Sequence, residues 1–329
     1  MINMAVIGTN VISERFMNAA RLVKDVHIYA VYSRSEETGS RFAKQCDIPK
    51  VFTHLEEMAR DEMIDAVYIA SPNALHASQA ITLMNHKKHV LCEKPIASNA
   101  REVQEMINAS VNNKVALMEA VKNTLVPNFK QIQENLHKIG TIRRYVANYC
   151  QYSSRYDAYK EGTVLNAFNP SLSNGALMDI GIYCIYPMVV LFGMPSSLKA
   201  HGHLLEANVD GEGSILFDYE EMEGVVMYSK ITNSHMPSEI QGEKGSMIID
   251  AMNVPSCVVI HYNDGTKEEI TAVQEDRDMY YEIEEFRHII KNKSLESSIN
   301  SHTTSLYTAK IMEKARKQID VTYPADRYD

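Results

Sequence analysis

Short apolar runs alternate with stretches of helical character over the first 120 residues, and this alternation limits the fold more than any other feature of the chain. The runs are rich in Val, Ile and Leu, as expected for strands buried on both faces of a parallel sheet. A β–α–β succession of this kind predicts an α/β fold with a right-handed, doubly wound parallel sheet. The predicted strands cover residues 2–8, 26–32, 66–71, 89–92 and 115–119.

The pattern changes after residue 120, which indicates a change of topology rather than a flexible linker. Residues 197–272 contain strand-like runs separated by turn signals such as Asp264-Gly265, which indicate an antiparallel sheet. The other predicted elements are helices at 126–138, 175–191, 279–292 and 301–319, a strand at 142–151 and a polar loop over 153–174. The second part of the chain is therefore expected to be an α+β domain.

The charge balance excludes some classes of partner. The 329 residues carry a formal net charge of -9, with no dense block of Lys and Arg. Such a chain is a poor candidate for binding nucleic acid or an anionic membrane surface. No stretch approaches the ~18 apolar residues of a membrane-spanning helix. We therefore expect neither nucleic acid nor a membrane among its partners.

The five cysteines are scattered, and no C-x-x-C pair occurs. Neither a zinc knuckle nor a dithiol redox motif is visible, so no metal site is expected. An odd number of cysteines in a chain of this length is typical of free thiols in a reducing compartment. The N-terminus lacks the pattern of a secretory signal peptide. These features predict a cytoplasmic protein.

Ligands of an open parallel sheet bind beyond the carboxyl ends of its strands, so these ends are the places to look for a site. The first strand ends in Gly8, Thr9, Asn10, Val11 and Ile12, where a dinucleotide-binding protein carries G-x-G-x-x-G. Only the first glycine is present, since Asn10 and Ser13 occupy the other two glycine positions. Gly8 permits a tight turn, and the following helix offers N–H groups to a phosphate. An ordinary strand–turn–helix is the alternative.

The second and third strand ends carry further candidates. Ser33 and Arg34 stand where an acid would bind the ribose 2′-hydroxyl of NAD, and an arginine there favours NADP. Ser71, Asn73 and His76 follow the next strand. Asn73 is suited to capping the helix that follows, and His76 is either directed at the ligand or structural.

The fourth strand end, Glu93-Lys94-Pro95, is the most specific of the set. Two opposite charges follow a buried apolar run, and Pro95 keeps Lys94 out of the helical region. A surface ion pair is the alternative, but the position at a strand's carboxyl end favours a functional lysine.

A second candidate cluster lies on the helix expected over 175–191. Asp179 and Tyr183 are four residues apart and therefore share a helix face, different from the apolar one. Pro187 has no N–H and so leaves the Tyr183 carbonyl without its usual helical partner.

Taken together, these motifs resemble the glucose-fructose oxidoreductase and inositol dehydrogenase family, known as Gfo/Idh/MocA. The resemblance covers nearly the whole chain, and the spacing of its E-K-P and A-L-x-D-x-G motifs is specific. The matching segments are the first strand–turn–helix, Ser71-Pro72-Asn73 with His76, Glu93-Lys94-Pro95, Glu119-Ala120, Gly175 to Gly181, Gly242 to Ser246, and Tyr281-Glu282 to Arg316.

The resemblance implies a dinucleotide-binding Rossmann domain over residues 1–120. It also implies a substrate-binding and oligomerisation domain over 121–329 with a large, mostly antiparallel open sheet. Through this sheet the chain would form a homodimer or homotetramer. Lys94 would lie beside the nicotinamide and Asp179 in the substrate pocket, with Glu93 and Asn123 among the cofactor-binding residues. The run D-I-G-I-Y that ends at Tyr183 resembles the dimeric dihydrodiol dehydrogenase branch of the family. By this resemblance, Tyr183 would exchange a proton with the substrate.

The expected function is hydride transfer between NADP, with NAD possible, and a carbonyl or hydroxyl carbon of a sugar, polyol or vicinal diol. Lys94, Asp179 and Tyr183 are the expected catalytic residues. Arg155 and Tyr156, from the loop over 152–169, join Asp179 and Tyr183 as candidates for substrate contact. The alternatives are a non-catalytic regulator that senses NAD(P) and a small-molecule binding module without nicotinamide.

Overall fold

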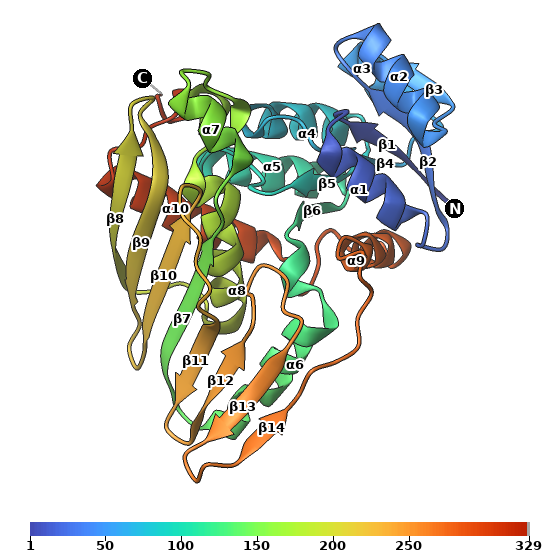
Figure 1. Cartoon of the computed structure of the whole chain (residues 1–329). Helices are drawn as coiled ribbons and strands as arrows, with labels where there is room; N and C mark the ends of the chain where they lie inside the picture. Colours follow the sequence, from blue (N-terminus) through green and yellow to red (C-terminus); the bar gives the residue numbers. More distant parts are fainter. Residues whose placement is uncertain (328–329) are drawn as a thin grey trace. The chain divides into compact units, whose positions relative to one another are not determined.

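The structure is a computed structural model that describes residues 1–327. The chain divides into two compact units, which are described separately (Figure 1). The first unit comprises Met1–Lys122 together with Glu275–Ser305. The second comprises Asn123–Gln274 together with the segment from Leu306 onward.

The first unit contains a six-stranded sheet in the order β3-β2-β1-β4-β5-β6. All its strand pairs are parallel, as predicted. Five strands were expected, and the additional one is the short edge strand β3. The strands are β1 (Ile2–Ile7), β2 (Val26–Tyr32), β3 (Lys50–Phe52), β4 (Ala66–Ile69), β5 (His89–Glu93) and β6 (Leu117–Ala120).

Helices connect these strands, and the sequence signals at their ends explain where they begin. The side chains of Asn10, Ser35 and Asn99 each accept a hydrogen bond from a backbone N–H in the first turn. Asn73 does not cap α4 as expected, because it lies in the 3-10 turn Asn73–Leu75 that precedes the helix. The helices are α1 (Val11–Ala20), α2 (Glu36–Cys46), α3 (Leu55–Arg60), α4 (His76–Asn85), α5 (Ala100–Asn113) and α9 (Tyr280–Lys291).

The strand order of this sheet reverses between β1 and β4. In open α/β sheets, the crevice at this reversal is the usual ligand site, because the flanking helices diverge there. The chain leaves β1 at Gly8 and β4 at Ala70, so these two segments lie side by side at the carboxyl edge of the sheet. The fold thus places the first predicted loop at the expected ligand position.

The second unit contains an eight-stranded sheet in the order β14-β13-β12-β11-β7-β10-β9-β8. The pair β7 and β10 is parallel and every other pair is antiparallel, so the predicted α/β fold with a large, mostly antiparallel second sheet is confirmed. The strands are β7 (Ile142–Cys150), β8 (Ser197–Leu205), β9 (Val209–Asp218), β10 (Glu223–Ser229), β11 (Ser238–Gly242), β12 (Gly245–Ile249), β13 (Val258–Tyr262) and β14 (Lys267–Glu269).

The helices of the second unit are α6 (Pro127–Asn135), α7 (Ser154–Lys160), α8 (Ile182–Phe192) and α10 (His302–Gln318), which begins at the end of the first unit. The helix expected over 175–191 begins with a π-helical segment, Leu177–Gly181, before α8. The polar loop expected over 153–174 is partly helical, since it contains α7, for which no apolar period gave a signal.

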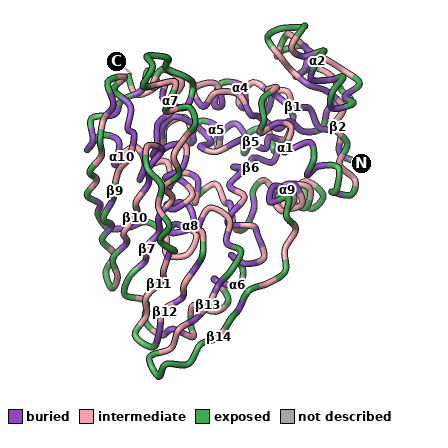
Figure 2. Tube along the Cα trace, in the orientation of Figure 1, coloured by how far each residue is buried: buried purple, intermediate pink, exposed green. Residues whose placement is uncertain are grey.

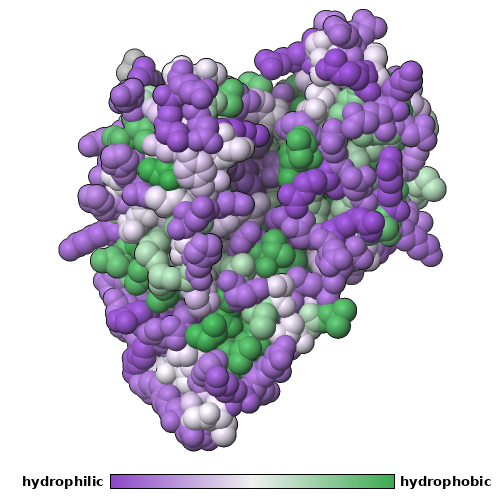
Figure 3. Space-filling view, in the orientation of Figure 1, coloured by the Kyte–Doolittle hydropathy of each residue, from purple (hydrophilic) through white to green (hydrophobic). Residues whose placement is uncertain are grey.

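Burial follows the period of each element (Figure 2). Over residues 214–218 of β9 and 223–228 of β10, buried side chains alternate with partly or fully exposed ones, as in a sheet with one face against the core. Every residue of β4 is buried, as in a strand that is covered on both faces. No helix within residues 1–327 has the length and apolar character to cross a membrane. The face seen in Figure 3 is mainly hydrophilic, with hydrophobic side chains in small separate groups.

Candidate active site

The first predicted loop is built around the backbone carbonyl of Ala70. Gly8 has a φ of +111°, and a Cβ on it would lie 2.7 Å from the Ala70 oxygen, so only glycine fits. Asn10 donates a hydrogen bond from Nδ2 to the same oxygen over 2.9 Å. Its Oδ1 accepts the Ser13 N–H at 3.1 Å. The asparagine that replaces the second glycine therefore ties the turn to the next strand and caps α1.

This loop keeps the features that a phosphate requires. The N–H groups of Val11 and Ile12 begin α1 and have no acceptor within the helix. The helix dipole adds a partial positive charge at the same end. Thr9 lies between Gly8 and the cap. The geometry of the loop therefore fits the pyrophosphate of a dinucleotide.

The residues expected to select the cofactor follow β2. Ser33 is half-buried, and its backbone N–H bonds to Phe52 O at 3.0 Å. Ser35 caps α2 through its hydroxyl. Arg34 lies between them, is exposed, and forms no ion pair with an acid among residues 1–327. An exposed guanidinium at this position is able to pair with a 2′-phosphate.

His76 lies inside the first unit rather than at its surface. The ring is fully buried, with Nδ1 2.9 Å from Pro95 O and Nε2 2.9 Å from Ser71 O. Burial lowers the pKa of His76 below its ordinary value. The imidazole thus connects the segment after β4 to the segment after β5. The Ser71 hydroxyl donates to Gln79, and Asn73 is buried.

Glu93 and Lys94 end strand β5 with different environments. Glu93 is buried, and its carboxylate accepts a hydrogen bond of 2.6 Å from the Tyr68 hydroxyl. Burial raises the pKa of Glu93, and the Lys94 charge opposes that rise. Lys94 is half-buried, and its backbone N–H donates to Glu93 Oε2 at 3.2 Å. Glu93 is therefore a buried carboxylate, and only Lys94 of the two charged residues is partly exposed.

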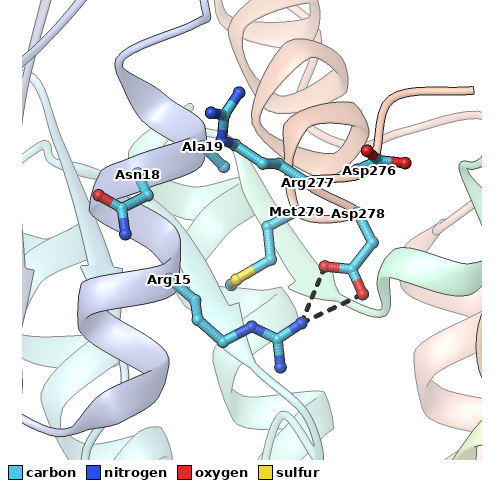
Figure 4. Close-up of a pocket in the computed structure, with 7 residues that line it drawn as sticks. All are labelled: Arg15, Asn18, Ala19, Asp276, Arg277, Asp278 and Met279. Atoms are coloured by element: carbon cyan, nitrogen blue, oxygen red, sulfur yellow. Dashed lines mark hydrogen bonds and ion pairs between the residues drawn. The ribbon is translucent and has the colours of Figure 1, made fainter.

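Further charged groups of the first unit were not among the predicted site residues. Asp278 accepts hydrogen bonds from Arg15, at 3.1 Å, and from Lys122. A pocket of about 200 Å³ adjoins this pair between α1 and residues 276–279 (Figure 4). Glu282 is buried, and its pKa is raised first by burial and then by the charge of Glu93. These contacts join α1 and α9 to the chain that leaves β6.

In the second unit, the sequence brings Asp179 and Tyr183 onto one helical segment. Asp179 lies in the π-helical turn, a type of irregularity that is frequent at functional sites. The start of this turn is held by Asp210, which is fully buried and whose Oδ2 accepts the Leu177 N–H at 2.6 Å. Burial raises the pKa of Asp210 to about 6. Gly175 is required here, since a Cβ on it would lie 2.1 Å from Asp210 Oδ1.

The Tyr183 carbonyl, which Pro187 leaves without a helical donor, is bonded by a side chain instead. Asn123 donates from Nδ2 to Tyr183 O at 3.0 Å and to Met252 O at 2.7 Å. Asn123 is one of the predicted cofactor-binding residues, and its amide nitrogen anchors the helix that carries Tyr183. The Tyr183 ring packs edge-on against Tyr149, with centroids 5.8 Å apart.

Asp179 has a partner that sequence reasoning missed. Lys230, directly after β10, pairs through Nζ with Asp179 Oδ2. The sequence signal that could have identified Lys230 is the one that identified Lys94, namely a charged residue directly after an apolar strand. Of the predicted substrate residues, Tyr156 packs against Phe168 and Tyr159 on α7, and Arg155 is exposed. No group of three or more His, Cys, Asp or Glu within residues 1–327 is arranged to hold a metal ion.

Comparison with known proteins places both units in one family. The GFO/IDH/MocA model, described as an oxidoreductase family with an NAD-binding Rossmann fold, matches residues 2–121. The model of the GFO/IDH/MocA C-terminal domain matches residues 130–248.

Two curated relatives span nearly the full chain. A scyllo-inositol 2-dehydrogenase (NADP(+)) of Bacillus subtilis is 55% identical over 327 residues, which cover 99% of this chain and 100% of the relative. A trans-1,2-dihydrobenzene-1,2-diol dehydrogenase of Xenopus tropicalis is 31% identical over 313 residues, which cover 91% of this chain and 92% of the relative.

Solved structures share the fold. Levoglucosan dehydrogenase in complex with NADH and levoglucosan has a TM-score of 0.87 at 19% identity, with 97% of each chain covered. A 3-ketoreductase from Actinomadura kijaniata with NADP and TDP-benzene has a TM-score of 0.84 at 21% identity, with 98% of this chain and 99% of that chain covered.

Proposed function

The chain belongs to the Gfo/Idh/MocA family of oxidoreductases, and from this premise we propose that it oxidises a secondary alcohol of a cyclic polyol with NADP. Its reaction class is hydride transfer between the nicotinamide of NAD(P) and a carbon that carries a hydroxyl or carbonyl oxygen. The observation that carries the polyol is the 55% identity, over almost all of both chains, with an enzyme named for scyllo-inositol and NADP.

The proposed cofactor contacts lie in the first unit. The turn Gly8, Thr9, Asn10, Val11 and Ile12 would hold the pyrophosphate, and Ser33 with Arg34 the 2′-phosphate. Ser71, Asn73 and Glu93 would lie near the nicotinamide half, with His76 bracing their segments. Asn123 is proposed to act there through its backbone position, since its side chain is used in the second unit. When bound, the nicotinamide supplies the hydride acceptor or donor.

The proposed catalytic residues divide the remaining chemistry. Tyr183 would take the proton of the substrate alcohol or return it to the carbonyl. The Lys94 ammonium would orient the reacting oxygen and stabilise its negative charge. Asp179 would accept hydrogen bonds from neighbouring substrate hydroxyls, with Arg155 and Tyr156 bounding the pocket. On this proposal residues 1–120 serve the cofactor and residues 121–329 the substrate.

A turnover assay tests the function. Purified protein is incubated with NADP or NAD and a panel of scyllo-inositol, myo-inositol, a simple sugar and a trans-dihydrodiol. The chain has no tryptophan, so reduced-nicotinamide fluorescence has little protein background. We expect turnover of an inositol with NADP. Absence of turnover on the whole panel, with NADPH still binding, would favour the non-catalytic regulator.

Cofactor preference is tested at Arg34. Replacing it with alanine should weaken NADPH binding by roughly tenfold or more, about 1.4 kcal/mol, while NADH binding changes little. Arg41 on α2 is the matched control, because it is an exposed arginine of the same unit that pairs with Glu37. If Arg34→Ala and Arg41→Ala bind NADPH equally, Arg34 does not select the cofactor.

We also propose that the chain forms a homodimer or homotetramer through the outer face of the eight-stranded sheet. Leu216, Val225 and Val146 are paired directly across β9, β10 and β7. On the far side of Glu239 the same row continues with Ile248 and Val259. Leu216 is 54% exposed, and an apolar stripe on an open sheet face is typical of an association surface.

Light scattering tests this association. Leu216→Glu should convert the oligomer to a smaller species, because a charge would be buried in the interface. Val273→Glu is the control, since Val273 is 99% exposed and lies outside the row. An unaltered chain that is monomeric at working concentration would contradict the proposal.

The five cysteines are free, which is consistent with the proposed cytoplasmic location.

A further inference from the structure

Lys230 is a buried cation in the second unit. Only 4% of its side chain is exposed, compared with 33% for its partner Asp179. Its backbone is fixed on both sides, since its N–H donates to Gly211 O at 2.9 Å and its carbonyl accepts the Ser153 N–H at 2.9 Å. The main chain that carries this lysine is therefore held on both sides.

Burying this ammonium costs free energy that its contacts must offset. Removing a charge from water costs several kcal/mol, and a buried ion pair recovers that cost only with good geometry. Nζ has two such contacts, the Asp179 carboxylate and the Phe168 ring, whose centroid is 5.3 Å away. A buried ion pair is weak evidence for a contribution to stability, so a stability role is a weak explanation.

The two exposures indicate the direction in which the pair acts. The cation lies inside and the carboxylate reaches the surface of the unit, so the pair presents negative charge rather than positive charge outward. The backbone that carries Asp179 is held as well. Its π-helical turn begins at Leu177, whose N–H donates a hydrogen bond to the Asp210 carboxylate. Asp179 is thus fixed by its backbone and by one of its oxygens.

We propose that Lys230 is a positioning residue for the substrate: it orients the Asp179 carboxylate to accept hydrogen bonds from adjacent hydroxyls of a polyol. This role rests on the function proposed above, in which Asp179 contacts substrate. Hydroxyl-to-carboxylate hydrogen bonds are short and strong, and a substrate without the hydroxyl does not form them. The Lys230–Asp179 pair would therefore select hydroxyl-rich substrates over apolar carbonyl compounds.

The test compares Lys230→Met, Lys230→Arg and the unaltered enzyme. Lys230→Met keeps the length and apolar stem but removes the charge, and it should raise KM for the inositol by roughly tenfold or more, with a smaller change in kcat. Lys230→Arg should recover much of the loss, since it restores the charge. The matched control is Lys130→Met, which removes a lysine of an exposed pair with Glu134 in the same unit.

A binding measurement separates this role from damage to the fold. The inositol is titrated into each protein saturated with NADPH, so that no turnover occurs. Lys230→Met should weaken inositol affinity by the same factor as KM while NADPH affinity stays unchanged. Its effect should be non-additive with that of Asp179→Asn, because both changes remove one interaction.

The outcomes distinguish the two proposals. If the unaltered enzyme turns over the inositol and Lys230→Met has the same KM and affinity, or its effect adds fully to that of Asp179→Asn, the positioning role is wrong and the function stands. If the unaltered enzyme neither binds nor turns over any polyol, the function and the role of Lys230 both fall. Equal losses of inositol and NADPH binding would also overturn the role, since they would mark a folding defect.

Discussion

At the scale of single residues, the incomplete glycine motif shows how a turn keeps its shape with different residues. The second glycine of the usual motif allows close approach of the backbone, and here Asn10 is present instead. Its side chain is directed to Ala70 O and Ser13. The asparagine thereby stabilises the loop from within, while Gly8 supplies the one conformation that no other residue adopts easily.

Gly8→Ala should therefore be costly in two ways. The positive φ alone costs about 1 kcal/mol for a non-glycine residue, and the contact of the new Cβ with Ala70 O adds displacement of β4. We expect the variant to lose roughly 2 kcal/mol or more of stability and to bind NADPH weakly. Gly265→Ala is the control, because its φ is +88° with open space around it. Equal losses in the two variants, measured by urea unfolding, would show that the contact does not matter.

At the scale of elements, the helix that carries Tyr183 depends on a residue distant in sequence. Pro187 removes the donor for the Tyr183 carbonyl, and Asn123 supplies one at 3.0 Å. The proline was visible in the sequence, but its compensation was not, because no local pattern links positions 123 and 183. The same holds for Asp210, which begins the π-helical turn from another strand.

A double-mutant cycle tests this substitution of donors. Asn123→Ala leaves the Tyr183 and Met252 carbonyls without their donor and should cost about 1–3 kcal/mol. Pro187→Ala returns an N–H for the Tyr183 carbonyl, so the double variant should lose less than the sum of the single variants. Asn128 also donates to a backbone carbonyl, that of Ala272, far from the proline. The cycle of Asn128→Ala with Pro187→Ala should therefore be additive, and additivity in both cycles would contradict the explanation.

At the scale of the whole molecule, the sequence predicted the architecture well and the side-chain environments poorly. Strand–helix alternation is a backbone property of long segments, so both sheets were anticipated, and only the three-residue β3 and the helix α7 were missed. Burial of a single charged residue depends on what packs over it. The position after an apolar strand marks Lys230 as a candidate, but it does not give the burial that separates Lys230 from the exposed Lys130, or Glu119 from the exposed Glu105. The roles of the predicted site residues stay predictions.

The buried carboxylates also give the molecule a pH dependence. Burial raises the pKa of Glu119 on β6 to about 7, from 4.5. A carboxyl group whose pKa is raised on folding favours the folded state when protonated, so its contribution falls as pH rises from 4.5 to 7. The buried His76, His89 and His302 have lowered pKa values and act in the opposite direction. Their contribution to stability rises with pH until the unfolded chain has lost its histidine protons, about one pH unit above the ordinary value of 6.5.

Between pH 6.5 and 8 the carboxylates lower the stability while the last of the histidine contribution is gained, so the effect of Glu119 is measured as the difference between variants. Glu119 alone should account for roughly 1 kcal/mol in this window, which is a few degrees in Tm. Glu119→Gln should remove this decrease, because the neutral amide has no charge to desolvate. In the unaltered protein the Ile96 N–H donates to Glu119 Oε1 at 2.9 Å, and the amide oxygen of Gln can accept the same hydrogen bond. Glu105→Gln, which changes an exposed glutamate paired with Arg101, should leave the slope intact. If the Tm of the unaltered protein and that of Glu119→Gln change with pH in the same way, Glu119 is already ionised in the folded state.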